Sequence, residues 1–260
     1  MASIEFSLDE GGDAPVALIT LSNPPLNLFG PDSFDALDAA IAEVEASPAR
    51  AAVWRAEGDI FTGGVDVQVF ADAVASGEEG FPSLVGPVRR LEALEMPTLA
   101  ICHGLCLTAG LEVALGCDMI WAGESARFGL VERVVGLTPG AGGTQRMAER
   151  AGPARAREFV MSGRLYDAAT LERWNVINRV LPDADLHEKA MAFARELAAG
   201  PTRAHAMTKR IVRAYLDGGI DAADEVTPGV FGDLFATEDL QGAVRSFLDE
   251  GPGKATFRGR

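Results

Sequence analysis

Lysine, histidine and cysteine are scarce in this sequence of 260 residues. Only three of the 23 basic side chains are lysines, and the excess of acidic residues gives a formal net charge of −15 at pH 7. An acidic surface repels the phosphodiester backbone of nucleic acids unless basic side chains gather on one face. The composition therefore argues against a nucleic-acid partner.

The few histidines and cysteines are not spaced as metal ligands. The three histidines lie far apart in the sequence, and Cys102 and Cys106 lack the second pair of ligands that a zinc site needs. All three cysteines, Cys117 included, fall in one apolar region, which favours small core residues in a reducing cytoplasm over disulfides. We expect no metal site.

A membrane-spanning segment and an export signal are also missing. The most apolar window, residues 98–122, is long enough to cross a bilayer, but it holds His103, Glu112 and three glycines and has no flanking basic cluster. The first 13 residues show no basic region followed by an apolar block. We expect a cytoplasmic protein that does not enter a membrane.

Motifs of two common enzyme classes are absent. The glycine-rich stretch PGAGGTQR at residues 139–146 lacks the lysine of a phosphate-binding loop, and it contains no GxGxxG pattern. Neither a GxSxG elbow nor a suitable Ser/His/Asp set occurs, and the adjacent Cys102 and His103 would point to opposite faces of a strand. We interpret residues 139–146 as a close-packed turn that enters a helix.

Short apolar segments alternate with helical patterns in the first two thirds of the chain. An apolar face recurs at helical spacing between residues 34 and 44. The expected strands are residues 16–21, 51–55, 97–102 and 119–122. Strands that alternate with helices are typical of an α/β fold.

The pattern becomes helical from about residue 153. The expected C-terminal helices are residues 204–216, 221–236 and 240–248. We place a boundary near residue 200, which divides the chain into a catalytic core, residues 1–200, and a helical domain, residues 201–260.

A loose repeat occurs within the core. FTGGVD at residues 61–66 and LTAGLE at residues 107–112 share an apolar residue, Thr, a small residue, Gly, an apolar residue and an acid. The spacing is not that of a solenoid. The similarity indicates one supersecondary unit used more than once, and chance likeness between glycine-rich turns is the alternative.

Glu112 is the one glutamate of an otherwise apolar helical segment, LTAGLEVALGCD. With Thr108 as the N-cap, Glu112 lies one position beyond the reach of a capping box, and no Lys or Arg lies three or four positions away. A buried, unpaired carboxylate is costly or takes up a proton, and proteins keep such groups mainly where the altered pKa is useful. The pattern points to acid/base chemistry; the alternative is a helix whose Glu112 side faces water.

Small residues at the start of this helix leave its amides open. The first four amides of a helix have no partner within it and carry partial positive charge. Ala109 and its neighbours would let a carbonyl oxygen approach, and the glycine pair that ends with Gly64 offers the same before Val65, although a tight turn alone also explains that pair. Two such amides that converge on one oxygen would form an oxyanion hole.

Three segments together resemble the enoyl-CoA hydratase/isomerase family, the crotonase superfamily. FTGGVDVQVF is similar to the family's F-x-x-G-x-D segment, and HGLCLTAGLEVALGCD to its NG-x-x-x-GGG-x-E-x-x-x-x-CD segment. RFGLVERVVGLTPGAGGTQR is similar to FG-x-PE-x-x-x-G-x-x-PG-x-GGTQR. Since FATEDLQGAVRSFLDEGPGKATF is also similar to the family's C-terminal region, the resemblance covers nearly the whole chain.

The resemblance implies a fold, an assembly and a substrate. The fold would be a crotonase-like spiral of ββα units followed by a C-terminal helical domain, assembled as a homotrimer or a dimer of trimers. The substrate would be an acyl-CoA thioester, so that coenzyme A belongs to the substrate and no separate cofactor is needed. The amides of Val65 and Ala109 would bind the thioester oxygen and contribute about 3 to 4 kcal/mol each to transition-state stabilisation.

Family members that hydrate a double bond carry two glutamates, at positions that match Glu112 and Glu132. The implied enzyme is an enoyl-CoA hydratase, a hydro-lyase that adds water across the C2=C3 bond of a trans-2-enoyl-CoA to give a 3-hydroxyacyl-CoA. By position, Glu112 would hold the water that attacks C3 and Glu132 would exchange the proton at C2. Two carboxylates in one cavity would titrate as a coupled pair. For Glu132, a surface ion pair with Arg127 or Arg133 is the alternative.

The resemblance also implies further residues at the substrate or its CoA group. These are Gly64, Asp66, Gln68, Gly140 and Arg258. Gln68 stands where many members have a lysine, and the basic residue often found after the first strand is missing. Arg258 matches a C-terminal lysine that often acts from a neighbouring subunit, so we expect it to bind the CoA phosphates.

Two departures from the family pattern affect the reacting groups. Thr108 and Ala109 replace two glycines of the GGG motif. Their side chains leave less space around the backbone, but the amide of Ala109 is retained. Val131 replaces the proline before the second glutamate, which can alter the direction of Glu132.

Two other functions remain open from the sequence. A Δ3,Δ2-enoyl-CoA isomerase of the same superfamily needs one acid, and a non-catalytic relative would bind acyl-CoA or RNA. The presence of both glutamates disfavours simple acyl-CoA binding, and the net charge of −15 disfavours RNA.

Overall fold

A six-stranded sheet forms the core of the computed structural model, which describes residues 3–77 and 85–260. The strand order is β1-β2-β3-β4-β6-β9, and only β1 runs antiparallel to its neighbour. The strands are β1 (Ser3–Asp9), β2 (Val16–Ser22), β3 (Ala51–Ala56), β4 (Thr98–Cys102), β6 (Met119–Gly123) and β9 (Arg179–Leu181). All four strands expected from the sequence are present.

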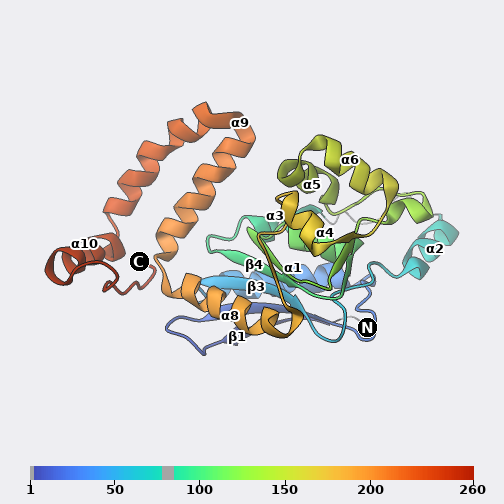
Figure 1. Cartoon of the computed structure of the whole chain (residues 1–260), viewed down its shortest axis with the longest axis horizontal. Coiled ribbons are helices and arrows are strands. Elements are labelled where there is room, and N and C mark those ends of the chain that lie inside the picture. The colour runs from blue at the N-terminus through green and yellow to red at the C-terminus, as the bar shows by residue number, and fades with distance from the viewer. Residues whose placement is uncertain (1–2, 78–84) are drawn as a thin grey trace.

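Helices cover both faces of this sheet. On one face α1 (Ser33–Ala46), α3 (Val85–Glu92) and α4 (Thr108–Leu115) share a single apolar core with the strands. On the other face α8 (Asp183–Ala199) packs its apolar side against the sheet. Figure 1 shows α8 along one side of the sheet and α4 on the other. The expected α/β fold is confirmed, and α1 presents to the core the face predicted between residues 34 and 44.

A second, three-stranded sheet carries the segments that matter for function. It consists of β5 (Leu105–Leu107), β7 (Arg127–Gly129) and β8 (Tyr166–Asp167). The helix α4 begins directly after β5, and a 3-10 turn, η1 (Glu132–Val135), follows soon after β7. The remaining helices of this part are α2 (Val67–Ser76), α5 (Gly143–Ala151), α6 (Pro153–Ser162) and α7 (Ala168–Arg173).

The apolar window at residues 98–122 is folded as β4, β5, α4 and β6. Its three cysteines are buried and free, as expected. None of the helices in the described part of the chain combines the length and the apolar character needed to cross a bilayer.

Two long helices form the C-terminal region. α9 (Thr202–Phe235) is interrupted at Gly219, whose φ of 77° breaks the helix and turns it into a hairpin. α10 (Glu238–Glu250) follows after a short turn. The break separates the two helices expected at 204–216 and 221–236, and Figure 1 shows α9 and α10 projecting from the body of the molecule.

Candidate active site

A short backbone ladder joins the two segments that carry Val65 and Ala109. Thr62 N donates to Leu105 O at 2.8 Å, Leu107 N donates to Thr62 O at 3.1 Å, and Thr62 forms a parallel bridge with Cys106. Val65 lies three residues after Thr62, as Ala109 does after Cys106, so the ladder brings the two amides to the same end. The ladder pairs residues that are 44 positions apart, Thr62 with Cys106, whereas the repeat in the sequence aligns residues that are 46 positions apart.

Among the described residues, neither amide is used in a backbone hydrogen bond to a loop or strand. Val65 bridges to Phe29, but the two bonds of this bridge use Gly64 O, at 2.8 Å, and Asp66 N, at 2.9 Å, and leave the Val65 amide out. Ala109 is buried in the first turn of α4, where an amide has no carbonyl partner within the helix. Gly64, with φ of 105°, supplies the left-handed backbone conformation directly before Val65.

Glu112 points into the protein. Its residue is only 2% exposed, so the alternative of a water-facing helix side is wrong. The Oε1 atom accepts hydrogen bonds from Ala141 N at 2.9 Å and Gly143 N at 2.8 Å. Burial raises the pKa of Glu112, while the amides of Gly143, Ala141 and Gly140 oppose that rise by stabilising the charged form. The carboxylate is therefore held in a fixed orientation.

The turn PGAGGTQR is the structure that holds Glu112. A Cβ atom on Gly143 would lie 2.8 Å from Glu112 Cγ, so only glycine allows this close approach. Arg146, 5% exposed, donates to Gly142 O at 3.3 Å and pairs with Glu92 Oε2 at 2.8 Å. The prediction of a close-packed turn is confirmed, but the sequence did not reveal that its amides bind the glutamate.

Glu132 lies at the start of η1 with both carboxyl oxygens buried and without a hydrogen-bond partner in the described residues. Arg133 Nη1 donates instead to Ser162 O at 2.7 Å, and Arg127 Nη1 donates to Ser125 O at 2.9 Å. The alternative of an ion pair is therefore wrong. Burial in the first place, and also the charge of Glu112, raise the pKa of Glu132 to about 7.

Thr108 differs from its expected role. The N-cap of α4 is Leu107, in an extended conformation, and Thr108 is the first helical residue, with φ of 43° and no capping bond. Its hydroxyl oxygen is buried without a partner in the part of the chain that the structure describes. Of the five such side-chain atoms, three belong to Thr108 and Glu132. One unsatisfied group thus lies next to Gly64 and directly before Ala109, and the others lie close enough to Glu112 to feel its charge.

Asp66 and Gln68 lie at the start of α2, next to Val65. Asp66 Oδ1 caps this helix by accepting Gln68 N at 2.9 Å, and Gln68 Nε2 donates to Asp72 Oδ1 at 2.7 Å on the exposed surface. Gly140 is exposed, and its amide lies close enough to Glu112 to lower the pKa of that carboxyl. Asp66 is therefore adjacent to one of the two amides and Gly140 lies beside Glu112, whereas the side chain of Gln68 is engaged with Asp72 on the surface.

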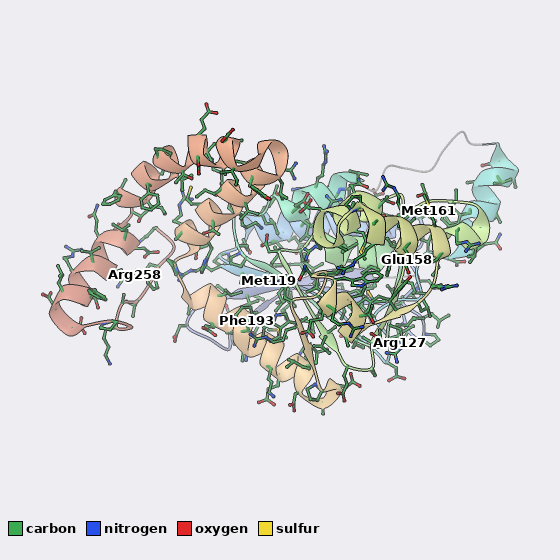
Figure 2. The ribbon with its side chains drawn as sticks, turned by 45° about the horizontal axis from the view of Figure 1, so that its top comes forward. Met119, Arg127, Glu158, Met161, Phe193 and Arg258 are labelled. Carbon is green, nitrogen blue, oxygen red and sulfur yellow. The ribbon has the colours of Figure 1, made fainter. Side chains whose placement is uncertain are left out.

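Arg258 is not brought to this site within one chain. Its backbone N donates to Asp239 Oδ1 at 2.7 Å, which fastens the C-terminal tail to α10. Figure 2 shows Arg258 at the opposite end of the molecule from Glu158 and Met161 of α6.

The described residues contain no group of three or more His, Cys, Asp or Glu side chains placed to hold a metal ion. The chemistry available at the site consists of two backbone donors and two carboxyl groups. This set can stabilise negative charge on a carbonyl oxygen while protons move at the adjoining carbon atoms.

Comparison with known proteins finds similar sequences and structures along nearly the whole chain. The sequence model described as Enoyl-CoA hydratase/isomerase matches residues 11–259. The short-chain-enoyl-CoA hydratase of Clostridium acetobutylicum is 30% identical over 242 residues, which cover 92% of this chain and 93% of that protein. The mitochondrial enoyl-CoA hydratase of Pongo abelii is 29% identical over 262 residues, which cover 99% of this chain and 89% of that protein.

A solved structure has the same fold. Subunit I of the enoyl-CoA hydratase of Geobacillus kaustophilus superposes with a TM-score of 0.88 at 30% identity, over 99% of each chain. The crotonase-like fold expected from the sequence is therefore confirmed.

Proposed function

The chain belongs to the enoyl-CoA hydratase/isomerase family, and from this premise we propose how its residues hydrate a trans-2-enoyl-CoA. It is an enzyme of the hydro-lyase type, and its substrate is an acyl-CoA thioester. The observation that carries the assignment is a pair of glutamates whose carboxyl groups are buried close to each other, Glu112 bonded by two backbone amides and Glu132 without a partner in the described residues.

The amides of Val65 and Ala109 bind the thioester oxygen. As water adds to C3, electrons move from the C2=C3 bond toward this oxygen, and the resulting enolate is stabilised by the two donors. Each amide is fixed by the backbone around it, so little reorganisation is needed as the charge develops.

Glu112 orients and deprotonates the attacking water. Burial raises the pKa of Glu112, and the amides on its Oε1 oppose this rise by stabilising the ionised form, which a general base requires. Glu132 supplies the proton to C2, because a carboxyl group with a pKa of about 7 is still partly protonated at neutral pH. The two acids titrate as a coupled pair, so the charge on Glu112 helps to keep the proton on Glu132. No metal and no separate cofactor take part in this scheme.

We also propose that the protein assembles as a homotrimer or a dimer of trimers, with Arg258 serving a neighbouring copy. This proposal is supported by the distance of the C-terminal tail from the site in its own chain and by the apolar side chains on α9 and α10. In that arrangement the guanidinium of Arg258 would supply the positive charge for the CoA phosphates, because the neutral Gln68 cannot.

Activity on crotonyl-CoA tests the assignment. The purified protein should convert crotonyl-CoA to a product that is heavier by one water, as measured by mass spectrometry. Glu112→Gln should lower the rate of hydration by roughly 10²- to 10⁴-fold, because it removes the general base. Exchange of the C2 hydrogen with deuterium in a bound saturated thioester should persist in this variant, since Glu132 is retained.

A protein that shifts the double bond of a 3-enoyl-CoA but never consumes water would be a Δ3,Δ2-isomerase instead. Tight binding of acyl-CoA without turnover of either substrate would indicate a non-catalytic protein.

A further inference from the structure

Thr108 combines two unfavourable features at the start of α4. Its φ of 43° lies in the left-handed region, where the Cβ of an L-residue crowds the backbone and a branched side chain is a rare occupant. Its residue is 8% exposed, and its hydroxyl has no hydrogen-bond partner in the described residues. Glycine at this position would avoid both costs.

The position of this hydroxyl relates it to both oxyanion donors. Thr108 directly precedes Ala109, and its Oγ1 packs against Gly64, which directly precedes Val65. A Cβ atom on Gly64 would collide with Thr108 Oγ1. The hydroxyl therefore lies where the two turns that carry the amides meet.

Thr62 shows what a structural threonine looks like in the same region. Its side chain is also buried, but Thr62 Oγ1 donates to Asn27 O at 2.7 Å and accepts from Gly64 N at 2.9 Å. The hydroxyl of Thr62 is thus fully used to fix the turn, whereas that of Thr108 contributes no bond to the fold. Buried polar groups left unsatisfied, and strained residues, occur preferentially where a ligand supplies the compensation.

We propose that the Thr108 hydroxyl is a third hydrogen-bond donor to the thioester oxygen, beside the amides of Val65 and Ala109. This inference rests on the proposed function and adds a side-chain donor to its two backbone donors. The Thr108 hydroxyl lies against Gly64, so an oxygen bound by the amides that follow Gly64 and Thr108 would lie close to it. The bond strengthens as the oxygen becomes an enolate, because hydrogen bonds to charged acceptors are stronger than those to neutral ones.

Two substitutions at this position separate the hydroxyl from the shape of the side chain. Thr108→Val keeps the branched shape and removes the donor, and it should lower kcat by about 10- to 100-fold with little change in KM. Thr108→Ser keeps the donor and should retain most of the activity. Thr20→Val, at a buried threonine of β2 outside the site, is the control and should leave kcat unchanged.

A spectroscopic measurement tests the bond itself. The carbonyl stretch of butyryl-CoA labelled with ¹³C at the thioester carbon should move to lower frequency on binding to the wild-type protein. The shift should be smaller with Thr108→Val and preserved with Thr108→Ser. Thr108→Gly should raise the melting temperature by relieving the backbone, yet should lose the same part of the carbonyl shift.

The outcomes distinguish this inference from the proposed function. If the wild type hydrates crotonyl-CoA while Thr108→Val matches it in kcat and carbonyl shift, the third donor is excluded and the hydratase stands. If the wild type does not hydrate but its carbonyl shift depends on Thr108, the donor stands and the hydratase is excluded. Failure to bind any acyl-CoA would overturn both.

Discussion

Two glutamates in one site differ in the number of donors they receive. One oxygen of Glu112 accepts hydrogen bonds from two backbone amides, whereas neither oxygen of Glu132 has a hydrogen-bond partner in the described residues. Burial raises the pKa of both carboxyl groups, but the amide donors oppose this rise at Glu112, whereas the pKa of Glu132 reaches about 7. The division of labour between base and acid thus follows from the local backbone around each side chain.

The stability of the protein should report the protonation of Glu132. Because its folded pKa of about 7 lies above the ordinary 4.5, the folded chain holds the proton more tightly than the unfolded chain. The corresponding stability is fully present below pH 4.5 and is lost as the pH rises through 7. Relative to Glu132→Gln, the wild type should therefore lose roughly 2 to 3 kcal/mol of unfolding free energy between pH 4.5 and 8.

Urea unfolding of both proteins at several pH values measures this difference. The two proteins share every other titrating group. The difference between their unfolding free energies therefore reports Glu132 alone. If the unfolding free energies of the two proteins change with pH in parallel across the whole range, the pKa of Glu132 is not raised in the folded state.

At this scale the sequence predicted the burial of Glu112 but not the conformation of Thr108. Glu112 was identifiable because it stands alone among apolar residues without a basic neighbour. Thr108 has the composition of an N-cap, yet β5 runs directly into α4 and leaves Leu107 at the cap position. Residue preference is local, whereas this junction is set by pairing of β5 with distant segments.

Among the elements, the turn before α5 has the most direct effect on the chemistry. It presents two amides to Glu112 and is held from behind by Arg146, which bonds to its carbonyl oxygens and to Glu92. A buried arginine that satisfies both a loop and an acid fixes the loop in one position.

Arg146→Met should therefore both destabilise the protein and impair catalysis. It leaves the carbonyl groups of Ala141 and Gly142 without their donor and Glu92 with only the longer contact to Arg213, which should cost about 1 to 3 kcal/mol in unfolding free energy. The released turn should lower kcat for crotonyl-CoA because Glu112 loses its fixed orientation. Chemical denaturation and steady-state kinetics measure the two effects.

Arg213 is a matched control, since it lies 3.7 Å from the same Glu92 oxygen but is exposed. Arg213→Met should cost at most about 1 kcal/mol and leave kcat unchanged. Equal effects of the two substitutions would show that Arg146 does not position the turn.

The parallel strands of the main sheet were predictable because each is a short apolar run, but two features were not. β1 alternates apolar and polar residues in the order expected of an edge strand, a signal that the sequence analysis missed. The repeat aligns Thr62 with Thr108 by residue type, but in the structure Thr62 pairs with Cys106, two positions earlier. Register depends on which side chains find room in the core, as Thr62 does against Gly110.

On the scale of the whole molecule, the C-terminal helices leave much apolar surface uncovered in a single chain. Phe231, Phe235, Phe247 and Leu248 are each more than half exposed. A groove of about 420 Å³ between α9 and α10 is lined by further apolar side chains. Exposed apolar surface of this kind commonly marks a protein interface.

Phe247→Asp should therefore dissociate the proposed trimer. A charge in the apolar groove disfavours burial against another copy, so sedimentation velocity should show smaller species than for the wild type. Val74→Asp, at an exposed valine on α2, is the control and should leave the assembly intact. If Arg258 serves a neighbouring copy, the dissociated variant and Arg258→Ala should both raise KM for crotonyl-CoA. A wild-type protein that sediments as a monomer would refute the assembly.

The ladder between residues 62 and 105–107 has a further consequence. The Val65 and Ala109 donors that it aligns belong to the main chain, so among single replacements only proline, which lacks the N–H group, can delete either one. Glu112 and Glu132 have no such protection. Random mutation would therefore remove or change the proton transfers well before it abolished binding of the thioester oxygen. Descendants of this gene could thus change their reaction while keeping their class of substrate.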